Sequence, residues 1–185
     1  KVWERTVNRR RNELSLGVDL GGTKIMAALV SPRGEVVARE YCPTLASRGQ
    51  EAVVGRIFGA IDHVVSSTGI EYSDLRGIGI AAAGAMDMER GVVTTSPNLP
   101  GWHNVPLKDI IEQKLGVDTF LINDGSAAAL GEHLFGAGRG VANLIYITVS
   151  TGVGGGIIIN SKLYLGASGS AGEIGHMTID VNGPQ

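Results

Sequence analysis

The sequence predicts a mixed α/β fold with one complete lobe of the order βββαβα and the start of a second lobe. Two glycine-rich turns, 19–24 and 150–156, each lie between apolar runs that are typical of strands. Between the turns, helical spacing of apolar residues alternates with short apolar strand-like runs. The second glycine turn has the same surroundings as the first, which indicates a duplicated unit.

The first predicted strands, 14–19, 25–31 and 35–41, are separated by two tight turns. The second turn, Ser31-Pro32-Arg33-Gly34, has the proline and glycine residues that favour a sharp reversal. Two successive tight hairpins require antiparallel pairing. The sequence therefore predicts an antiparallel three-stranded start.

The remaining elements of the first lobe alternate between helix and strand. Residues 50–67 have apolar side chains on one helical face, and Gly69 is a stop signal. Pro106 is the expected first residue of a second helix, which Gly116 ends. The other expectations are a strand at 76–83, a loop-rich stretch at 84–105, a strand at 119–122, a helix at 127–135 and a second hairpin from Leu144.

These elements predict a polar leader at 1–13, a first α/β lobe at 14–121 and the beginning of a second lobe at 122–185. The last residues, Asn182-Gly183-Pro184-Gln185, form a turn sequence well before a second lobe of equal size would be complete. We expect the second lobe to be truncated here and this chain alone to be inactive.

Composition narrows the possible functions. Hydrophobic residues make up 43% and charged residues 18% of the chain, which is typical of a globular protein. The net charge of −2 argues against a general nucleic-acid binder. No apolar run approaches the ~20 residues of a membrane span. Cys42 is the single cysteine, so no internal disulfide can form, which suits the cytoplasm.

The first glycine turn, Asp19-Leu20-Gly21-Gly22-Thr23-Lys24, has the chemistry of a phosphate site. Glycines allow close approach of the backbone, and a turn of exposed N–H groups suits anions. Asp19 can hold Mg²⁺ or its waters, although a turn-forming aspartate is the alternative. Lys24 adds positive charge, unless it is only an exposed strand lysine. In the second turn, the predicted nucleotide-binding residues are Thr151, Gly152 and Gly154.

Two common nucleotide motifs are absent from these turns. A P-loop requires G-x-x-x-x-G-K-[ST], and a dinucleotide fingerprint requires G-x-G-x-x-G between a strand and a helix. Both glycine turns here lead from one strand to another. They predict two hairpins that hold a polyphosphate, and hence an enzyme that uses a nucleotide.

Asn123 and Asp124 lie where a strand ends and a helix follows, which is a common catalytic position in open α/β sheets. Asp124 can accept a proton from a substrate hydroxyl that attacks a phosphoryl group. Asn123 can hold a neighbouring hydroxyl. Helix capping by Asp124 or Ser126 is the structural alternative.

Glu173 and His176 form a third polar group, three residues apart. Glu173 can accept hydrogen bonds from sugar hydroxyls, and His176 can bind a hydroxyl or a metal. A zinc site needs about four ligands, so His176 alone does not make one.

Together these motifs resemble the ROK family of bacterial glucokinases, related sugar kinases and sugar-responsive repressors. The resemblance runs from about Leu14 to about Asp180. It rests on five segments in order: Asp19–Lys24, Ser96-Pro97-Asn98-Leu99-Pro100-Gly101-Trp102, Asn123–Glu132, Ser150–Gly156 and Gly172-Glu173-Ile174-Gly175-His176.

The resemblance implies an actin-like ATPase (ribonuclease H-like) fold, with ATP and a sugar bound between two lobes. It implies Asp124 as the general base on the 6-hydroxyl of a hexose. It also implies a homo-oligomer, dimer or tetramer, and a structural Zn²⁺ in the full-length protein, with His176 as one ligand. The implied sugar contacts are Asn98, Asn123, Asp124, Glu173 and His176.

The chain departs from the family pattern at three places. Residues 81–84, Ala-Ala-Ala-Gly, lack the usual Gly-x-Pro-Gly form, which leaves the sugar preference open. Ser150 replaces a common glycine, and Gly125-Ser126 replaces a common Ala-Asn. None of these changes removes a group that phosphoryl transfer needs.

The favoured function is ATP- and Mg²⁺-dependent phosphorylation of a hexose, with glucose as the first candidate, in carbohydrate metabolism and glycolysis. The first alternative is a sugar-sensing transcriptional regulator whose DNA-binding domain is not in this chain. The second is an actin-like ATPase without a sugar, against which Asn98, Glu173 and His176 argue. A kinase needs no nucleic-acid or membrane partner.

Overall fold

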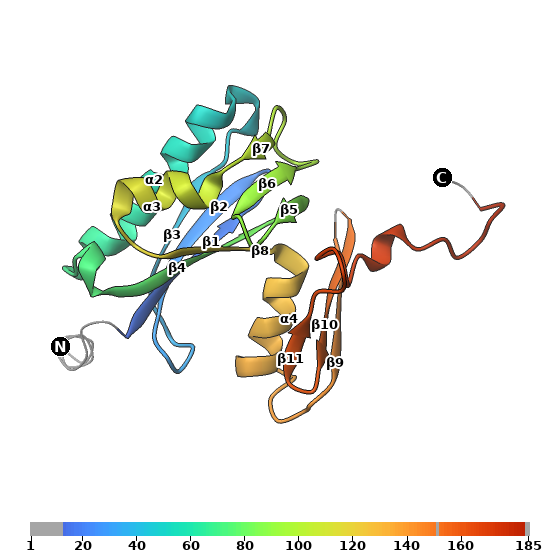
Figure 1. The fold of residues 1–185 in the computed structure, drawn as a ribbon. Coiled ribbons are helices and arrows are strands. Elements are labelled where there is room, and N and C mark those ends of the chain that lie inside the picture. Colours follow the sequence, from blue (N-terminus) through green and yellow to red (C-terminus); the bar gives the residue numbers. More distant parts are fainter. Residues whose placement is uncertain (1–12, 151, 184–185) are drawn as a thin grey trace. The chain divides into compact units, whose positions relative to one another are not determined.

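A five-stranded mixed sheet forms the centre of the first of two units, Lys1–Asp124 and Gly125–Gln185, into which the chain divides (Figure 1). The computed structural model describes residues 13–150 and 152–183. The sheet order is β3-β2-β1-β4-β8. Its strands are β1 (Leu14–Leu20), β2 (Lys24–Val30), β3 (Val36–Pro43), β4 (Leu75–Ala82) and β8 (Thr119–Asn123).

The pairing of these strands confirms the predicted βββαβα order. β1, β2 and β3 pair antiparallel, because short turns connect them. β4 pairs parallel with β1, and β8 pairs parallel with β4. The three parallel strands therefore end at the same edge of the sheet, where the chain turns to its next segment.

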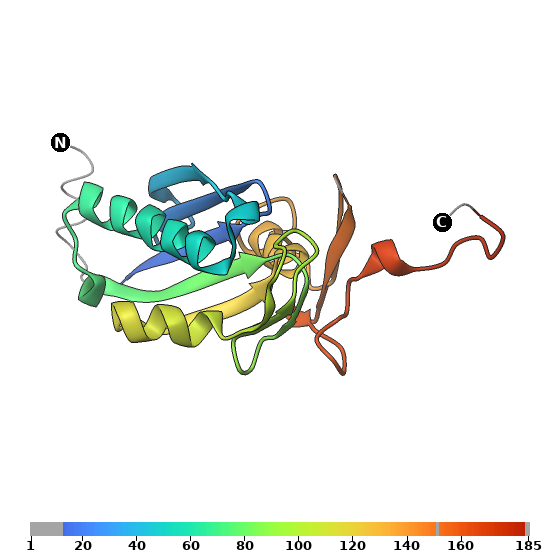
Figure 2. The same ribbon diagram turned by 90° about the horizontal axis from the view of Figure 1, so that it is seen from above.

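Two helices, α2 (Gln50–Thr68) and α3 (Leu107–Leu115), cover one face of this sheet and lie side by side in Figure 2. The core lies between them and the sheet, because alternate strand residues point to that face. α2 ends as predicted at Gly69, whose φ of 67° is left-handed. Fully buried core side chains include Leu16, Leu20, Ile57, Ile61, Ile78, Ile80 and Ile111.

The stretch 84–105, predicted to be mostly loop, contains a second sheet of three short strands. These are β5 (Ala85–Asp87), β6 (Val92–Thr95) and β7 (His103–Val105), with β6 in the middle. The strands are only three or four residues long, too short for a clear alternating pattern. Leu99 and Trp102 are each 1% exposed and fix the loop between β6 and β7 in the core.

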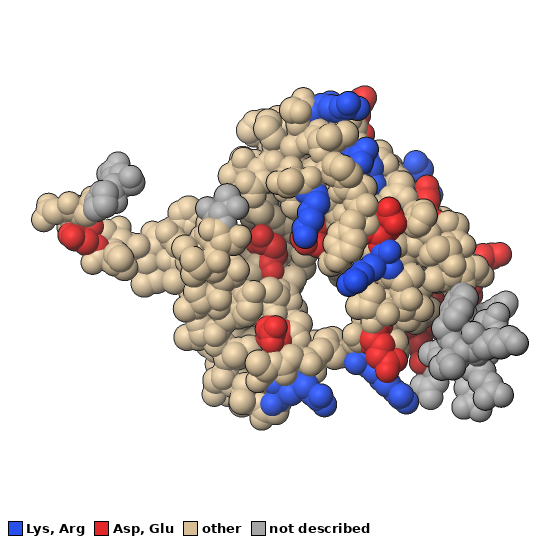
Figure 3. Space-filling view, turned by 180° about the vertical axis from the view of Figure 1, so that it is seen from behind, with Lys and Arg blue, Asp and Glu red and all other residues tan. Residues whose placement is uncertain are grey.

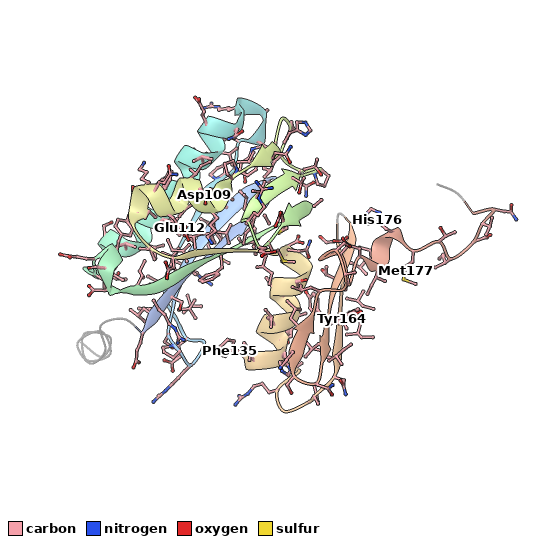
Figure 4. All side chains as sticks on the ribbon, viewed as in Figure 1. Asp109, Glu112, Phe135, Tyr164, His176 and Met177 are labelled. Atoms are coloured by element: carbon pink, nitrogen blue, oxygen red, sulfur yellow. The ribbon has the colours of Figure 1, made fainter. Side chains whose placement is uncertain are left out.

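The start of α3 also differs from the sequence prediction. Pro106 was expected as the first helical residue, but its ψ of 66° is not helical, and it occupies the N-cap position instead. Glu112, which projects from α3 in Figure 4, accepts a hydrogen bond at Oε1 from the backbone N of Thr119, at 2.7 Å. This bond fixes α3 to the first residue of β8.

The second unit contains α4 (Asp124–Phe135) and a three-stranded sheet of order β11-β10-β9. Its strands are β9 (Leu144–Val149), β10 (Val153–Ile159) and β11 (Lys162–Tyr164), which pair antiparallel. The described residues also contain the 3-10 turns η1 (Ala46–Arg48) and η2 (Tyr72–Asp74) in the first unit and η3 (Ile174–His176) in the second.

Two boundaries in this region correct the sequence prediction. α4 begins at Asp124 rather than at 127, so β8 leads directly into the helix. β10 begins at Val153, so residues 154–156 lie in the strand and not in the turn. The reason is close packing: a Cβ on Gly156 would lie 2.6 Å from the Cβ of Ala129 on α4. Glycine lets the helix approach the strand.

One face of the second sheet exposes apolar side chains. Ile145, Ile147 and Val149 alternate along β9 and are 65%, 55% and 78% exposed. β9 is also an edge strand of its sheet. An exposed apolar edge is prone to pairing with another chain. Among the described residues, no helix has the length and apolarity needed to cross a membrane.

The end of α2 provides a test of stability against pH. The Tyr72 hydroxyl donates a hydrogen bond to Oδ1 of Asp62. Burial, followed by the hydrogen bond to Asp62 and the negative charge of Asp62, raises the pKa of Tyr72 to about 12. Unfolded tyrosine releases its proton near pH 10, so between about pH 10 and 12 the unfolded state holds fewer protons. The free energy of unfolding should therefore fall as the pH rises through this window.

Urea unfolding at pH 9 and at pH 11.5 measures this contribution. The fall in unfolding free energy should be smaller in Tyr72→Phe than in the unchanged protein, because phenylalanine has no proton to release. An equal fall in both proteins would rule out Tyr72 as a source of the pH dependence.

Candidate functional site

The carboxyl ends of β1, β4 and β8 bring two predicted site segments to one edge of the first sheet. In the observed register, Asp19 lies beside Ala81, and Ala81 lies beside Ile122. Asn123, one residue further, ends β8, and Asp124 begins α4. Neighbouring strands are about 4.8 Å apart, so Asp19 lies roughly 10 Å from the end of β8.

The charged side chains of Asp124 and Lys24 affect the pKa of Asp19 at this edge. Asp19 is partly buried, whereas Asp124 is exposed. Burial raises the pKa of the Asp19 carboxyl above its ordinary value, and the negative charge of Asp124 raises it further. The positive charge of Lys24 acts in the opposite direction. The edge is therefore a place where an added positive charge would be stabilised.

Such a place fits a hard divalent cation such as Mg²⁺, which prefers oxygen ligands and keeps several waters. Asp19 is the residue that would hold the cation or its waters. Within residues 13–150 and 152–183, no group of three or more His, Cys, Asp or Glu side chains is arranged to hold a metal. The predicted zinc at His176 therefore has no set of ligands in this part of the protein.

The first glycine turn is closed by its own backbone. The Gly21 N–H donates to the carbonyl of Lys24 at 3.1 Å. Thr23 and Lys24 are exposed, as ligand-binding groups must be. The Lys24 Nζ lies 5.5 Å from the ring centroid of Tyr41 on β3. Lys24 thus extends along the strand surface while its charge still acts on Asp19.

Sequence reasoning missed Thr44, which contacts this turn from the end of β3. The Thr44 hydroxyl donates to the Gly21 carbonyl at 2.6 Å, and its backbone N–H donates to the Thr23 carbonyl at 2.9 Å. The side chain is fully buried. The register of the β2–β3 hairpin could have indicated Thr44. Lys24 pairs with Pro43, so Thr44, the next residue, lies opposite Thr23.

Asn98, predicted to contact sugar, lies against the same turn. A Cβ on Gly22 would come within 2.7 Å of the Asn98 Cβ and 2.9 Å of its carbonyl oxygen. Gly84, with a φ of 113°, meets the same loop, where a Cβ would lie 2.8 Å from the Ser96 Cα. Asn98 itself is exposed to solvent. The first unit therefore brings the first glycine turn, the Asn98 loop, Asn123 and Asp124 to one region.

The glycines of the segment 152–156, which includes the start of β10, fall into two groups. A Cβ on Gly152 would meet nothing within 4 Å, and one on Gly154 only the Thr148 methyl at 3.5 Å. Gly155 and Gly156 are instead crowded by neighbouring segments. Packing therefore explains why residues 155 and 156 are glycines. It does not explain Gly152 and Gly154, which stay predicted phosphate contacts. Thr151, predicted with them, lies outside the described residues.

Glu173 is the N-cap residue of η3 in the second unit, and His176 is the last residue of η3. The His176 Nε2 lies 3.9 Å from Oε2 of Glu173, and their side chains are 86% and 43% exposed. Figure 4 shows His176 next to Met177 on the segment after β11. Gly172 fixes this segment to β10, since a Cβ there would lie 2.7 Å from the Gly155 carbonyl oxygen. Both side chains are accessible to a ligand.

Acidic and basic side chains are interspersed on the face seen in Figure 3, and neither sign forms a broad field. The charged and polar groups that could contact a charged ligand in the first unit are few and local. These are the turn amides, Lys24 and the carboxylates of Asp19 and Asp124. The arrangement combines a candidate anion-binding turn, an edge where a positive charge would be stabilised, and a candidate general base.

Comparison with known proteins shows the family to which this chain belongs. The profile described as the ROK family matches residues 15–185. The chain is 41% identical to a glucokinase of Thermotoga maritima over 169 residues, which cover 91% of this chain and 52% of the relative. It is 39% identical to a xylose repressor of Caldicellulosiruptor bescii over 165 residues, covering 89% and 41% of the two chains.

A solved structure shows the same fold. The crystal structure of a ROK family glucokinase from Streptomyces griseus in complex with glucose and AMPPNP superposes with a TM-score of 0.80 at 40% identity. The match covers 90% of this chain and 51% of that one. The chain thus spans about half the length of the curated relatives it matches.

Proposed function

Because the chain belongs to the ROK family and has the actin-like ATPase fold of its glucokinases, we propose that it forms part of an ATP-dependent sugar kinase. The proposed reaction transfers the γ-phosphoryl group of ATP to the 6-hydroxyl of a hexose, with glucose as the first candidate. The observation that carries the proposal is the gathering of Asp19, the Gly21–Lys24 turn, Asn98 and Asp124 at one end of the first unit.

Asp124 is the proposed general base. It is exposed at the junction of β8 and α4, where a substrate hydroxyl can reach it. As the sugar oxygen bonds to the γ-phosphorus, its proton passes to the Asp124 carboxylate. The bond from that phosphorus to the bridging oxygen breaks, and ADP leaves with the electron pair.

The other residues hold the two substrates in place. We assign the sugar to Asn98, Asn123, Glu173 and His176, all of which offer polar groups to hydroxyls. The proposed phosphate contacts are Gly21, Gly22, Thr23, Lys24, Thr151, Gly152 and Gly154. Mg²⁺, when bound through Asp19 or its waters, would neutralise phosphate charge.

Sugar-dependent release of ADP from the full-length protein tests this function. The panel should include glucose, mannose, xylose and the N-acetylhexosamines, each with ATP and Mg²⁺ and with a no-sugar control. We expect ADP release that requires one of the hexoses. Release at the same rate without any sugar would instead favour an actin-like ATPase.

A sugar-sensing regulator is the second candidate, because the chain is 39% identical to a xylose repressor over 89% of its length. The two candidates predict different results for the same protein. A regulator would bind a sugar from the panel and release no ADP with any of them. Its full-length form should then bind DNA in a manner that the sugar changes.

The assembly and the compartment are also proposals. We propose a homo-oligomer, and the exposed apolar edge of β9 is a feature that pairing would bury. We place the enzyme in the cytoplasm, where its proposed donor ATP is made.

A further inference from the structure

The two adjacent glycines of the first turn, Gly21 and Gly22, would by themselves allow the peptide between them to adopt either of two orientations. Glycine adopts positive and negative φ with similar ease, so neither residue fixes the direction of the peptide between them. Rotation of a turn's central peptide exchanges the sides on which its C=O and N–H lie, as between type I and type II turns. A phosphate group needs the N–H, since a carbonyl oxygen would repel it.

Thr44 fixes this orientation from outside the turn. Its hydroxyl donates to the Gly21 carbonyl at 2.6 Å. In a planar trans peptide the C=O and the next N–H point in opposite directions. The hydrogen bond therefore directs the Gly22 N–H away from Thr44. The second bond, from the Thr44 N–H to the Thr23 carbonyl at 2.9 Å, sets the Lys24 N–H in the same way.

Burial makes this hydrogen bond hard to replace. Thr44 is fully buried, so water does not compete for its hydroxyl. A reversed Gly21–Gly22 peptide would leave that buried donor without its acceptor, which proteins strongly avoid. The turn has a second close neighbour, because a Cβ on Gly22 would lie 2.7 Å from the Asn98 Cβ. Both Thr44 and the Asn98 loop thus restrict the turn.

We propose that Thr44 is a positioning residue of the nucleotide site, which orients the Gly21–Gly22 peptide so that the Gly22 N–H can donate to phosphate. The proposal rests on the proposed function only in taking this turn as the phosphate turn. Thr44 itself touches no substrate. Its effect is on nucleotide affinity and not on the chemistry at Asp124.

Thr44→Val and Thr44→Ser in the full-length protein test the proposal. Valine keeps the shape and removes the hydroxyl, whereas serine keeps the hydroxyl. The loss of one neutral hydrogen bond corresponds to roughly threefold to tenfold in affinity. We expect Thr44→Val to raise the Kd and KM for ATP by that factor, with the sugar KM and kcat within about twofold of the unchanged protein. Thr44→Ser should restore the ATP affinity.

Thr68→Val is the matched control. Thr68 is also a buried threonine whose hydroxyl donates to a backbone carbonyl, that of Val65 at 2.8 Å, but it lies at the end of α2. It should lower the unfolding temperature without changing the ATP affinity. An unchanged ATP affinity in Thr44→Val, or an equal loss in Thr68→Val, would overturn the proposal.

Calorimetry measures ATP binding without any turnover. It can therefore test the role of Thr44 independently of the proposed kinase activity. A protein that binds ATP but phosphorylates no sugar would overturn the kinase function, while the Thr44→Val Kd would still decide the role of Thr44. A protein that binds no ATP would overturn both.

Discussion

Asp124→Asn in the full-length protein is expected to lower the rate of sugar phosphorylation by about 10²–10⁴-fold, the usual contribution of a general base. Asparagine keeps the size of the side chain but cannot accept the proton of the attacking hydroxyl. Because Asp124 is exposed at the start of α4, the change should leave the core intact. Sugar and ATP should still bind, so the loss should be in kcat.

Asp109→Asn is the control for this variant. Asp109 is an exposed carboxylate in the first turn of α3 (Figure 4), so it undergoes the same chemical change in a similar helical position. Its kcat should remain within about twofold of the unchanged protein. If Asp124→Asn kept a comparable kcat, another group would have to be the base.

Gly22→Ala is expected to weaken the use of both substrates at once, by more than about tenfold in kcat/KM for each. The added Cβ would come within 2.7 Å of the Asn98 Cβ and 2.9 Å of its carbonyl oxygen. Backbone atoms cannot give way as a side-chain tip can, so the phosphate turn and the sugar loop must move apart. A shift of about 1 Å in a substrate-positioning group can cost on the order of 10²-fold.

Gly59→Ala is the control for this variant, because it is the same glycine-to-alanine change at a site without close neighbours. Gly59 is exposed on α2, and an added Cβ there would meet nothing within 4 Å. The variant should be more stable by about 0.5–1 kcal/mol and keep both KM values. Steady-state kinetics with each substrate varied in turn measures the effect. A Gly22→Ala protein that lost only ATP affinity would show that the sugar loop does not depend on the turn.

Local pattern was sufficient to predict the main elements of the first unit. The β1–β2 hairpin follows from two apolar runs around a glycine pair, and α2 follows from the apolar stripe that ends at Gly69. The position of Asn123 and Asp124 at the end of a parallel strand was also predictable, because an apolar run ends there and a helix follows. In each case the signal lies within a few residues along the chain.

Contacts between distant segments explain what the sequence did not reveal. The strands β5, β6 and β7 are too short to show a period, and their pairing joins residues across a loop. Thr44 lies 23 residues from Gly21, and its role depends on a hairpin register. Glycines 155 and 156 looked like phosphate-turn residues, yet each is required by packing within the second unit.

The most direct test determines which hydroxyl of glucose receives the phosphate when the full-length protein is incubated with ATP, Mg²⁺ and glucose. The product can be identified by phosphorus and proton NMR, with Asp124→Asn as the blank and 6-deoxyglucose as a substrate that lacks the accepting hydroxyl. We expect glucose phosphorylated at its 6-hydroxyl, no product from 6-deoxyglucose and almost none from the variant. A phosphate on another carbon, equal product from the variant, or ATP consumed only to inorganic phosphate would show that the site does not work as proposed.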